Sequence, residues 1–379
     1  MPATAGSKTH GAFTIPSLDG IRAIAVLIVF VGHTATMPGL WPGHVGVTIF
    51  FFLSGYLITT LLRREHEKTS RISLPKFYLR RALRILPPAY LAIGAGVLVG
   101  AIGLLPATTT GWGVLAEVLN YTNYYLVFEG REGLPPETSM LWSLAVEEHF
   151  YLIFPALLIV LLWRKLSMRT IALILMGACA FAPIWRIILT AQGADFFRLY
   201  TSTDTRFDAL LFGAAMALLF NPAVGDRAPL GLSDRTISRL VPVALLVFAA
   251  TAVVDIPQFR LTIADTIQIM CLVPIFWFVI AQPNAWAGKI LNNRWLAHIG
   301  VLSFSVYLFH RLAISITGAF LPIEPVADAL AFPLTLVVAE LVYRLVEVPL
   351  GRLRRKLEIR APGTRLLPPR IGNRSKAQP

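Results

Sequence analysis

Residues 17–34 read "SLDGIRAIAVLIVFVGHT", an apolar run that begins with Asp19 and Arg22 and ends near His33. A helix needs about 20 mostly apolar residues to cross a membrane, and this run is close to that length. Similar runs recur along the 379-residue chain, which is 56% hydrophobic and 15% charged. Because an ordinary soluble domain has about 25% charged residues, the sequence predicts an all-α integral membrane protein.

Hydrophobic runs predict about ten transmembrane helices within one membrane domain. They cover residues 21–38, 44–62, 85–105, 140–163, 170–190, 206–221, 239–254, 262–282, 300–320 and 328–350. The segment 111–128 is more polar and aromatic, and Trp and Tyr favour the membrane interface, so an interfacial or re-entrant segment is predicted there. The predicted domains are a disordered tail (1–13), the membrane domain (14–350) and a basic cytoplasmic tail (351–379).

The net charge of +13 is unevenly distributed along the chain. With a cytoplasmic N-terminus, 26 of the 34 Lys and Arg residues fall in cytoplasmic segments, whereas the outer loops hold Arg131, Arg198 and Arg260. This distribution follows the positive-inside rule. It predicts a multi-pass protein of the cell (inner) membrane with both termini in the cytoplasm. Because membrane orientation accounts for the positive net charge, no nucleic-acid partner is expected.

Ionisable side chains inside spans are costly and indicate functional sites. Arg22 and His33 are eleven residues apart, so on a continuous helix they lie about 20° apart around the axis and share a face. Asp19 lies one turn before Arg22 and can pair with it, which leaves His33 as a titratable group near mid-membrane. The alternative is an Arg that marks the membrane boundary and a His satisfied by a backbone carbonyl.

The fourth predicted span contains "SLAVEEHFYL" (143–152). Glu147, Phe150 and Tyr151 share a helical face, while Glu148 and His149 point elsewhere. Glu147 is expected in the outer part of the membrane, at a depth that His33 could approach. The alternative is a carboxylate that binds an arginine of another helix.

Two further spans carry charged or titratable residues. Arg206 and Asp208 begin the sixth span, where the simpler interpretation is an ion pair at the start of a helix. His310 and Arg311 lie near the middle of the ninth span. A second intramembrane histidine favours a polar cavity over two independent accidents.

Three arginines, Arg80, Arg81 and Arg84, precede the third span. Arg81 and Arg84 are spaced i, i+3, so their guanidinium groups can bind one phosphate together. The alternative is that all three are ordinary positive-inside charge.

Taken together, these segments resemble acyltransferase family 3, the polytopic membrane acyltransferases that modify bacterial polysaccharides, lipopolysaccharide, peptidoglycan and some secondary metabolites. Arg22 and His33 match the family's Arg-x10-His pattern, and Arg81 and Arg84 match its Arg-x-x-Arg pattern. Glu147 holds a glutamate position of the family. The resemblance covers about residues 14–350 and rests on "LDGIRAIAVLIVFVGH" (18–33), "GVTIFFFLSGYLI" (46–58), "FYLRRALRILPPAY" (77–90), "LWSLAVEEHFYLIFP" (141–155), "SFSVYLFH" (303–310) and "YRLVEVPL" (343–350).

Two departures from the family pattern are visible. Thr48 stands where many relatives have an acidic residue, which weakens the transfer of any role assigned to that segment. The sequence also ends soon after the tenth predicted span, without the extracytoplasmic hydrolase-like domain of some relatives. The expectation is that the membrane domain acts alone or with a separate protein.

The resemblance implies an O-acyltransferase that uses acyl-CoA, commonly acetyl-CoA, as cosubstrate, with no bound cofactor and no metal. Arg81 and Arg84, supported by Arg80, are expected to hold the donor phosphates. His33 is expected to be the general base, although a covalent acyl-histidine remains open. Glu147 either orients the imidazole or positions the acceptor, and the role of Arg22 is left unassigned. Secondary candidates are Asp19, Ser54, Tyr151, Arg206, Asp208 and His310.

The preferred acceptor is a hydroxyl of a cell-envelope glycan or glycolipid, and the alternative is a cytoplasmic secondary metabolite such as a macrolide. A rival of another class is a secondary transporter or flippase, in which the same residues would relay protons or bind substrate. Transporters often show internal repeats and broken helices in both halves. Neither is evident in this sequence, which favours the enzyme.

Overall fold

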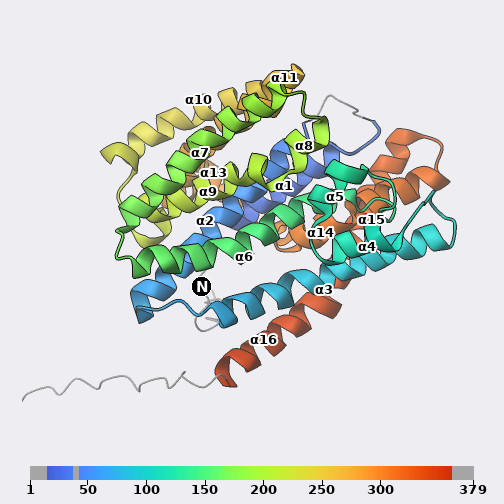
Figure 1. Cartoon of the computed structure of the whole chain (residues 1–379), viewed down its shortest axis with the longest axis horizontal. Helices are drawn as coiled ribbons and strands as arrows, with labels where there is room; N and C mark the ends of the chain where they lie inside the picture. The colour runs from blue at the N-terminus through green and yellow to red at the C-terminus, as the bar shows by residue number, and fades with distance from the viewer. Residues whose placement is uncertain (1–14, 37–41, 361–379) are drawn as a thin grey trace, which may run out of the picture.

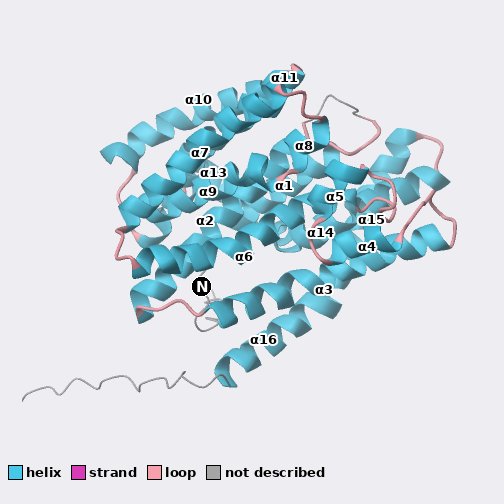
Figure 2. Ribbon diagram, in the orientation of Figure 1, coloured by secondary structure: helices cyan, strands magenta, loops and turns pink. Residues whose placement is uncertain are grey.

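Helices joined by loops make up the protein over residues 15–36 and 42–360, the ranges that the computed structural model describes (Figures 1 and 2). No strand occurs within these ranges. In a bilayer, a helix satisfies all its backbone hydrogen bonds within one segment, so long apolar runs become helices. The predicted all-α fold is confirmed, while the predicted tail at residues 1–13 lies outside the described residues.

The long helices correspond to the ten predicted spans. Their bounds are α1 Leu18–Val31, α2 His44–Thr69, α3 Leu74–Ala101, α6 Trp142–Trp163, α7 Met168–Ala191, α9 Thr203–Leu219, α10 Asp234–Val253, α12 Asp265–Ala281, α14 Arg294–Phe320 and α15 Glu324–Val342. Within the described ranges, nine candidate spans are long and apolar enough to cross a membrane. The tenth, α1, has 14 residues, so it rises about 21 Å and is shorter than a hydrocarbon core of about 30 Å.

Shorter elements connect these helices. They are α4 Gly111–Val118, α5 Thr122–Glu129, α8 Phe196–Thr201, α11 Pro257–Phe259, α13 Trp286–Leu291 and α16 Val348–Arg360, with 3-10 turns at Ser139–Leu141, Pro222–Val224 and Pro229–Gly231 and π-helical turns at Arg260–Ala264 and Tyr343–Glu347. Both α4 and α5 have eight residues, which is too short to cross a membrane. Residues 111–128 therefore form two short helices, in agreement with the predicted interfacial or re-entrant segment.

The first span ends earlier than predicted. Helix α1 stops at Val31, and His33 lies in the following turn. The Thr34 hydroxyl donates to the Val31 carbonyl oxygen at 2.7 Å, a side-chain bond that competes with the helical pattern. The premise that one continuous helix joins Arg22 and His33 is therefore wrong, because α1 ends two residues before His33.

Helix α2 is the most enclosed span. In its apolar 18-residue stretch, 78% is buried inside the protein, against 17% for the corresponding stretch of residues 324–357. Helix α2 packs mainly on α9, and α1 packs between α14 and α2. Two glycines allow the α2–α9 contact. A Cβ at Gly55 would lie 1.9 Å from the Leu210 carbonyl oxygen, and a Cβ at Gly213 would lie 2.1 Å from the Phe52 carbonyl oxygen. This close approach is typical of membrane helices that meet at small residues.

Helix α16 lies beside α3 at the lower edge of Figure 1. It extends to Arg360, ten residues beyond the boundary predicted at residue 350. The remainder of the predicted basic tail, residues 361–379, is outside the described part of the chain.

Candidate active site

The two ends of the bundle differ in chemistry. We name the end where α1 begins the basic end; the Ser17 backbone N–H donates to the Asn292 side chain there at 2.8 Å, close to the start of α14. The His33 end is the opposite one, where α1 ends. Three cavities follow one another from the basic end to the His33 end, and each shares lining residues with the next.

The α16 cavity opens at the basic end and has a volume of about 470 Å³. Its charged lining residues are Asp19, Arg22, Arg84, Glu347, Arg354 and Arg355. Arg22 lies 3.6 Å from Asp19, as its i, i+3 spacing predicted. The Ser305 hydroxyl donates to Glu347 at 2.6 Å. Four arginines against two carboxylates give this cavity a positive charge.

The Glu147 cavity comes next, has a volume of about 90 Å³ and shares Arg22 and Arg84 with the α16 cavity. The Ser54 hydroxyl donates to Glu147 Oε1 at 2.8 Å, and the Tyr151 hydroxyl lies 3.3 Å from Glu147 Oε2. Glu147 and Tyr151 face this cavity from one side of α6, as their i, i+4 spacing predicted.

Arginines from two helices complete the Glu147 cavity. Arg81 and Arg84 of α3 line it together with Arg22 of α1, and the Arg81 guanidinium lies 4.7 Å from the centre of the Tyr151 ring. One half-buried carboxylate, that of Glu147, thus lines the same cavity as three guanidinium groups. The pocket can hold an anionic group next to an apolar wall.

The His33 cavity has a volume of about 260 Å³ and shares Val47 and Tyr307 with the Glu147 cavity. The Tyr307 hydroxyl lies at this junction, 2.6 Å from the Ser143 hydroxyl and 3.0 Å from the Met140 carbonyl oxygen. The polar and aromatic residues of the lining are His33, His44, Arg131, Ser139, Trp142, Phe196, Phe197, Tyr200, Thr201, Arg260, Tyr307 and Arg311.

Two imidazoles meet at the edge of the His33 cavity. His33 Nδ1 lies 2.8 Å from the Val29 carbonyl oxygen, and His310 Nδ1 lies 2.6 Å from the Tyr307 carbonyl oxygen. A carbonyl oxygen can only accept, so both Nδ1 atoms carry hydrogen. His310 Nε2 is then unprotonated and lies 3.3 Å from His33 Nδ1, so it can share the single Nδ1 hydrogen with the closer Val29 carbonyl oxygen. This tautomer leaves His33 Nε2 unprotonated and available as a base.

The structure separates residues that the sequence placed in one site. Arg22 and Glu147 line the Glu147 cavity, whereas His33 lines the next one. The imidazole of His33 contacts a backbone carbonyl and His310, so of the two roles left open for Glu147, orienting His33 and positioning the acceptor, these contacts do not support the first. Arg80 also turns away from the cavity arginines, because it pairs with Glu65 at 3.3 Å.

The predicted ion pair between Arg206 and Asp208 is also wrong. Arg206 pairs with Asp265 of α12, and Asp208 accepts from Arg186 of α7 at 2.8 Å. Residues two apart on a helix point in different directions, so each finds its partner on another helix. These buried pairs connect α9 to its neighbours and support a structural role.

Thr48, the position of the family departure, lies beside one of these pairs. Its hydroxyl donates to Asp265 Oδ1 at 3.2 Å and accepts from Arg206 Nη2 at 3.2 Å. At this position the chain has a hydroxyl, and the carboxylate that pairs with Arg206 comes from Asp265 of α12.

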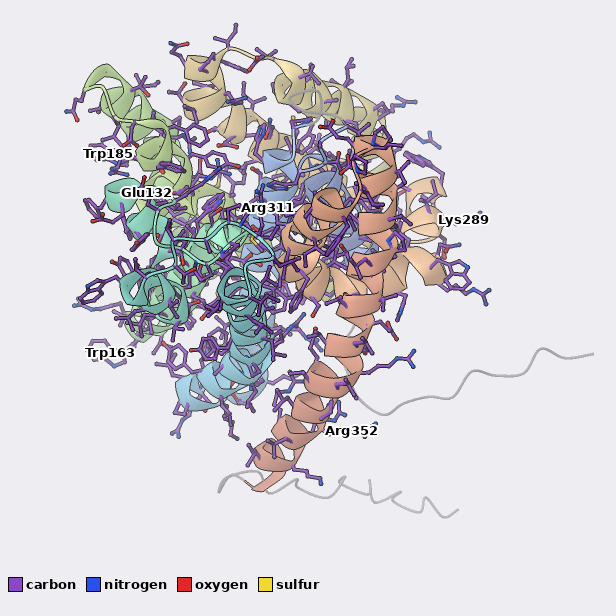
Figure 3. The ribbon with its side chains drawn as sticks, turned by 90° about the vertical axis from the view of Figure 1, so that its right-hand side faces the viewer. Glu132, Trp163, Trp185, Lys289, Arg311 and Arg352 are labelled. Atoms are coloured by element: carbon purple, nitrogen blue, oxygen red, sulfur yellow. The ribbon has the colours of Figure 1, made fainter. Side chains whose placement is uncertain are left out.

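Several lining residues were missed by the sequence analysis as site residues. Arg131 and Arg260 were recognised only as charges of the outer loops, and Tyr307 only as part of the quoted "SFSVYLFH" segment. For the two arginines, a signal was present in the sequence, because very few Lys or Arg residues fall in the predicted outer loops. Arg311 lies near the middle of Figure 3, which views the molecule from the right-hand side of Figure 1.

No group of three His, Cys, Asp or Glu side chains within the described ranges is arranged to hold a metal ion. The side chains of the three cavities instead offer cations, hydroxyls and two imidazoles. Such a set can bind anions and transfer protons.

The fold and these cavities define a polytopic helical membrane protein with polar chambers between its helices. The comparison with protein families identifies the class further: the family 3 acyltransferase domain model matches residues 15–344. The chain belongs to this family, and the resemblance expected from the motifs is confirmed.

Named relatives agree with this assignment. The chain is 32% identical over 357 residues to the peptidoglycan O-acetyltransferase OatA of Listeria monocytogenes, with 89% of this chain and 56% of OatA covered. It is 30% identical to a Staphylococcus aureus (strain COL) protein provisionally named an O-acetyltransferase, with 88% and 57% covered. The chain thus spans little more than half the length of these relatives. No solved structure shows significant similarity to it.

Proposed function

We propose that this protein is a membrane O-acyltransferase that takes an acyl group, normally acetyl, from cytoplasmic acyl-CoA and transfers it to a hydroxyl of a cell-envelope glycan. The observation that carries the proposal is the series of three cavities that links the arginine-rich basic end to His33. It is supported by the family membership and by relatives named for O-acetyl transfer.

The donor is assigned to the basic end. Acyl-CoA carries several phosphates, and the guanidinium fork of arginine binds phosphate with paired hydrogen bonds. Arg22 and Arg84 line both the α16 cavity and the Glu147 cavity, and Arg81 lines the second. The phosphates would bind among these arginines, and the narrow pantetheine arm would extend past Ser54 toward Tyr307.

His33 is assigned as the general base. Its Nε2 atom removes the proton of the acceptor hydroxyl, the oxygen attacks the thioester carbonyl carbon, and the C–S bond breaks with the electron pair leaving on sulfur. The proton then passes to the CoA thiolate. Arg311, which also lines the His33 cavity, is suited to stabilise negative charge that develops there.

The acceptor is assigned to the His33 end. The positive-inside distribution of Lys and Arg favours an extracytoplasmic location for this end. Relatives named for peptidoglycan support an envelope glycan over a cytoplasmic metabolite. Glu147, which faces the donor arginines rather than His33, is proposed to position the donor.

The test measures acetyl-CoA binding by calorimetry and CoA thiol release by the purified full chain in detergent, with water or added glycan as acceptor. For His33→Ala we expect intact donor binding and a turnover reduced by about 10²- to 10⁴-fold. For Arg81→Gln plus Arg84→Gln we expect loss of donor binding. The matched control is Arg235→Gln plus Arg239→Gln, two exposed arginines of α10, which should leave both measurements unchanged.

Two results would contradict the proposal. If monodisperse wild-type protein does not bind acetyl-CoA, the donor assignment is wrong and a transport function takes precedence. If His33→Ala turns over like the wild type, another group must be the base.

A further inference from the structure

The His33 cavity carries more positive charge than proton transfer needs. Arg131, Arg260 and Arg311 line it together with His33 and His44, and its lining contains neither Asp nor Glu among the described residues. Arg131 and Arg311 both lie close enough to His33 for their charges to act on the imidazole. The cavity therefore presents an electropositive surface beside the proposed base.

These arginines are unusual for this end of the molecule. The predicted outer loops hold three Lys or Arg residues in total, namely Arg131, Arg198 and Arg260. Arg198 is neutralised by Asp204, with hydrogen bonds of 2.8 and 2.5 Å. The other two come from loops 129 residues apart in sequence and converge on the same cavity.

The charges of the two loop arginines are weakly compensated. The contact of Arg260 with Asp255 is 3.4 Å long, and the Asp255 side chain is 87% exposed. Arg131 lies 5.9 Å from the centre of the Phe197 ring and has no ion pair within the described ranges. Arg311 differs, because it is paired with Glu137 at 2.5 Å. Arg131 and Arg260 are therefore the least compensated arginines of the cavity.

Aromatic rings form the remainder of the lining. Trp142, Phe196, Phe197 and Tyr200 line the cavity beside the arginines. Flat rings with polar groups at the edge suit a ligand that has an apolar face and a polar rim. A sugar ring has both features.

We propose that the His33 cavity selects a glycan acceptor bearing an anionic group, a carboxylate or a phosphate, which Arg131 and Arg260 bind while a sugar hydroxyl faces His33. The inference rests on the proposed function, because it names the substrate class of the same site. The donor phosphates have separate arginines in the other two cavities, so this second cationic group is left for the acceptor. A charge-assisted hydrogen bond to guanidinium is about twice as strong as a neutral one, which gives the site its preference.

The experiment compares three probes that differ only at C6: methyl glucoside, methyl glucuronide and methyl glucoside 6-phosphate. Ligand-observed NMR titration of the full chain in detergent measures their dissociation constants. We expect wild-type protein to bind at least one anionic probe about tenfold more tightly than the neutral one. The preferred probe tells a carboxylate from a phosphate, and its advantage should shrink between about 50 and about 500 mM salt.

The variant Arg131→Gln plus Arg260→Gln should bind all three probes like the neutral sugar. The control Arg198→Gln removes the third loop arginine and should keep the preference. Equal binding of anionic and neutral probes by wild-type protein, or an unchanged preference in the double variant, would overturn the inference.

Acetyl-CoA binding, measured on the same samples, separates this inference from the proposed function. The double variant should retain it, since its arginines lie outside the donor cavities. Intact donor binding without an anionic preference overturns only the acceptor inference. An anionic preference without any donor binding or turnover overturns only the proposed donor chemistry.

Discussion

His310 is placed to hold His33 in one tautomer, because its Nε2 atom faces His33 Nδ1 at 3.3 Å. It makes this contact away from the cavity, so it is a positioning residue for the proposed base. Without this contact the imidazole is less firmly oriented, so part of the general-base contribution of His33, about 10²- to 10⁴-fold in full, should be lost.

We therefore expect His310→Leu to lower kcat for thiol release by about 10- to 100-fold, a part of the full general-base contribution, while the KM for acetyl-CoA stays unchanged. His310→Gln retains an acceptor atom and should recover part of the loss. A Leu variant with wild-type kcat, or a Gln variant no better than Leu, would contradict the positioning role.

Glu117 of α4 is buried outside the membrane-spanning helices. Its Oε1 atom lies 2.5 Å from the Thr138 hydroxyl oxygen, which is also 2.7 Å from the Pro135 carbonyl oxygen. The hydroxyl has one hydrogen, so a protonated Glu117 satisfies both contacts. Burial raises the pKa of Glu117 to about 8, and the Thr138 contact offsets this only in part.

Because the folded pKa lies above the unfolded value of about 4.5, the folded state holds one more proton between these values. The free energy of unfolding should therefore fall as pH rises from about 4.5 to about 8. Glu117→Gln removes this pH dependence, because Gln does not titrate. The Tm of the variant minus the Tm of wild type should therefore increase from pH 5.5 to pH 8.5. A difference independent of pH would show that Glu117 is already ionised in the folded protein.

At the scale of elements, the contact of α2 with α9 depends on backbone approach at Gly55 and Gly213. Gly213→Ala would bring a Cβ within 2.1 Å of the Phe52 carbonyl oxygen, and backbone cannot move aside as a flexible side chain can. Overpacking of this kind costs about 1–3 kcal/mol. We expect a lower Tm in detergent for Gly213→Ala.

Gly177 of α7 provides the matched control. It is exposed and helical, and a Cβ there would meet nothing within 4 Å. Gly177→Ala should leave the Tm unchanged or raise it, since Ala is the better helix former. Equal Tm values for the two variants would mean that α2 and α9 can separate at no cost.

At the scale of the whole molecule, the charge distribution predicts which end faces the cytoplasm. Lys68 lies at the basic end and Glu129 near the other, and both side chains are exposed. We expect a membrane-impermeant maleimide to label Glu129→Cys in intact bacterial cells and Lys68→Cys only after permeabilisation. The native Cys179 and Cys271 are buried, so background labelling should be low. The reverse pattern would invert the proposed donor and acceptor sides.

The helical class, the number and approximate position of the spans, and the family could all be predicted from the amino-acid sequence. Hydropathy and charge settle these features because the cost of placing polar groups in hydrocarbon depends on composition, whatever neighbours a helix later finds. The sequence also identified Arg206, Asp208 and His310 as polar residues of the spans, but not their buried neighbours Arg186 and Asp265. The i, i+4 pair of Glu147 and Tyr151 was correct because both residues lie on one continuous helix.

Which of these residues contact one another became visible only in the folded protein. His33 lies beyond the end of α1 at Val31, and packing joins it to His310, 277 residues away. Arg206 finds Asp265 rather than Asp208, and Arg131 and Arg260 converge on one cavity. Such contacts depend on how helices distant in sequence pack and rotate against one another. The local pattern of residues along one helix does not predict that arrangement.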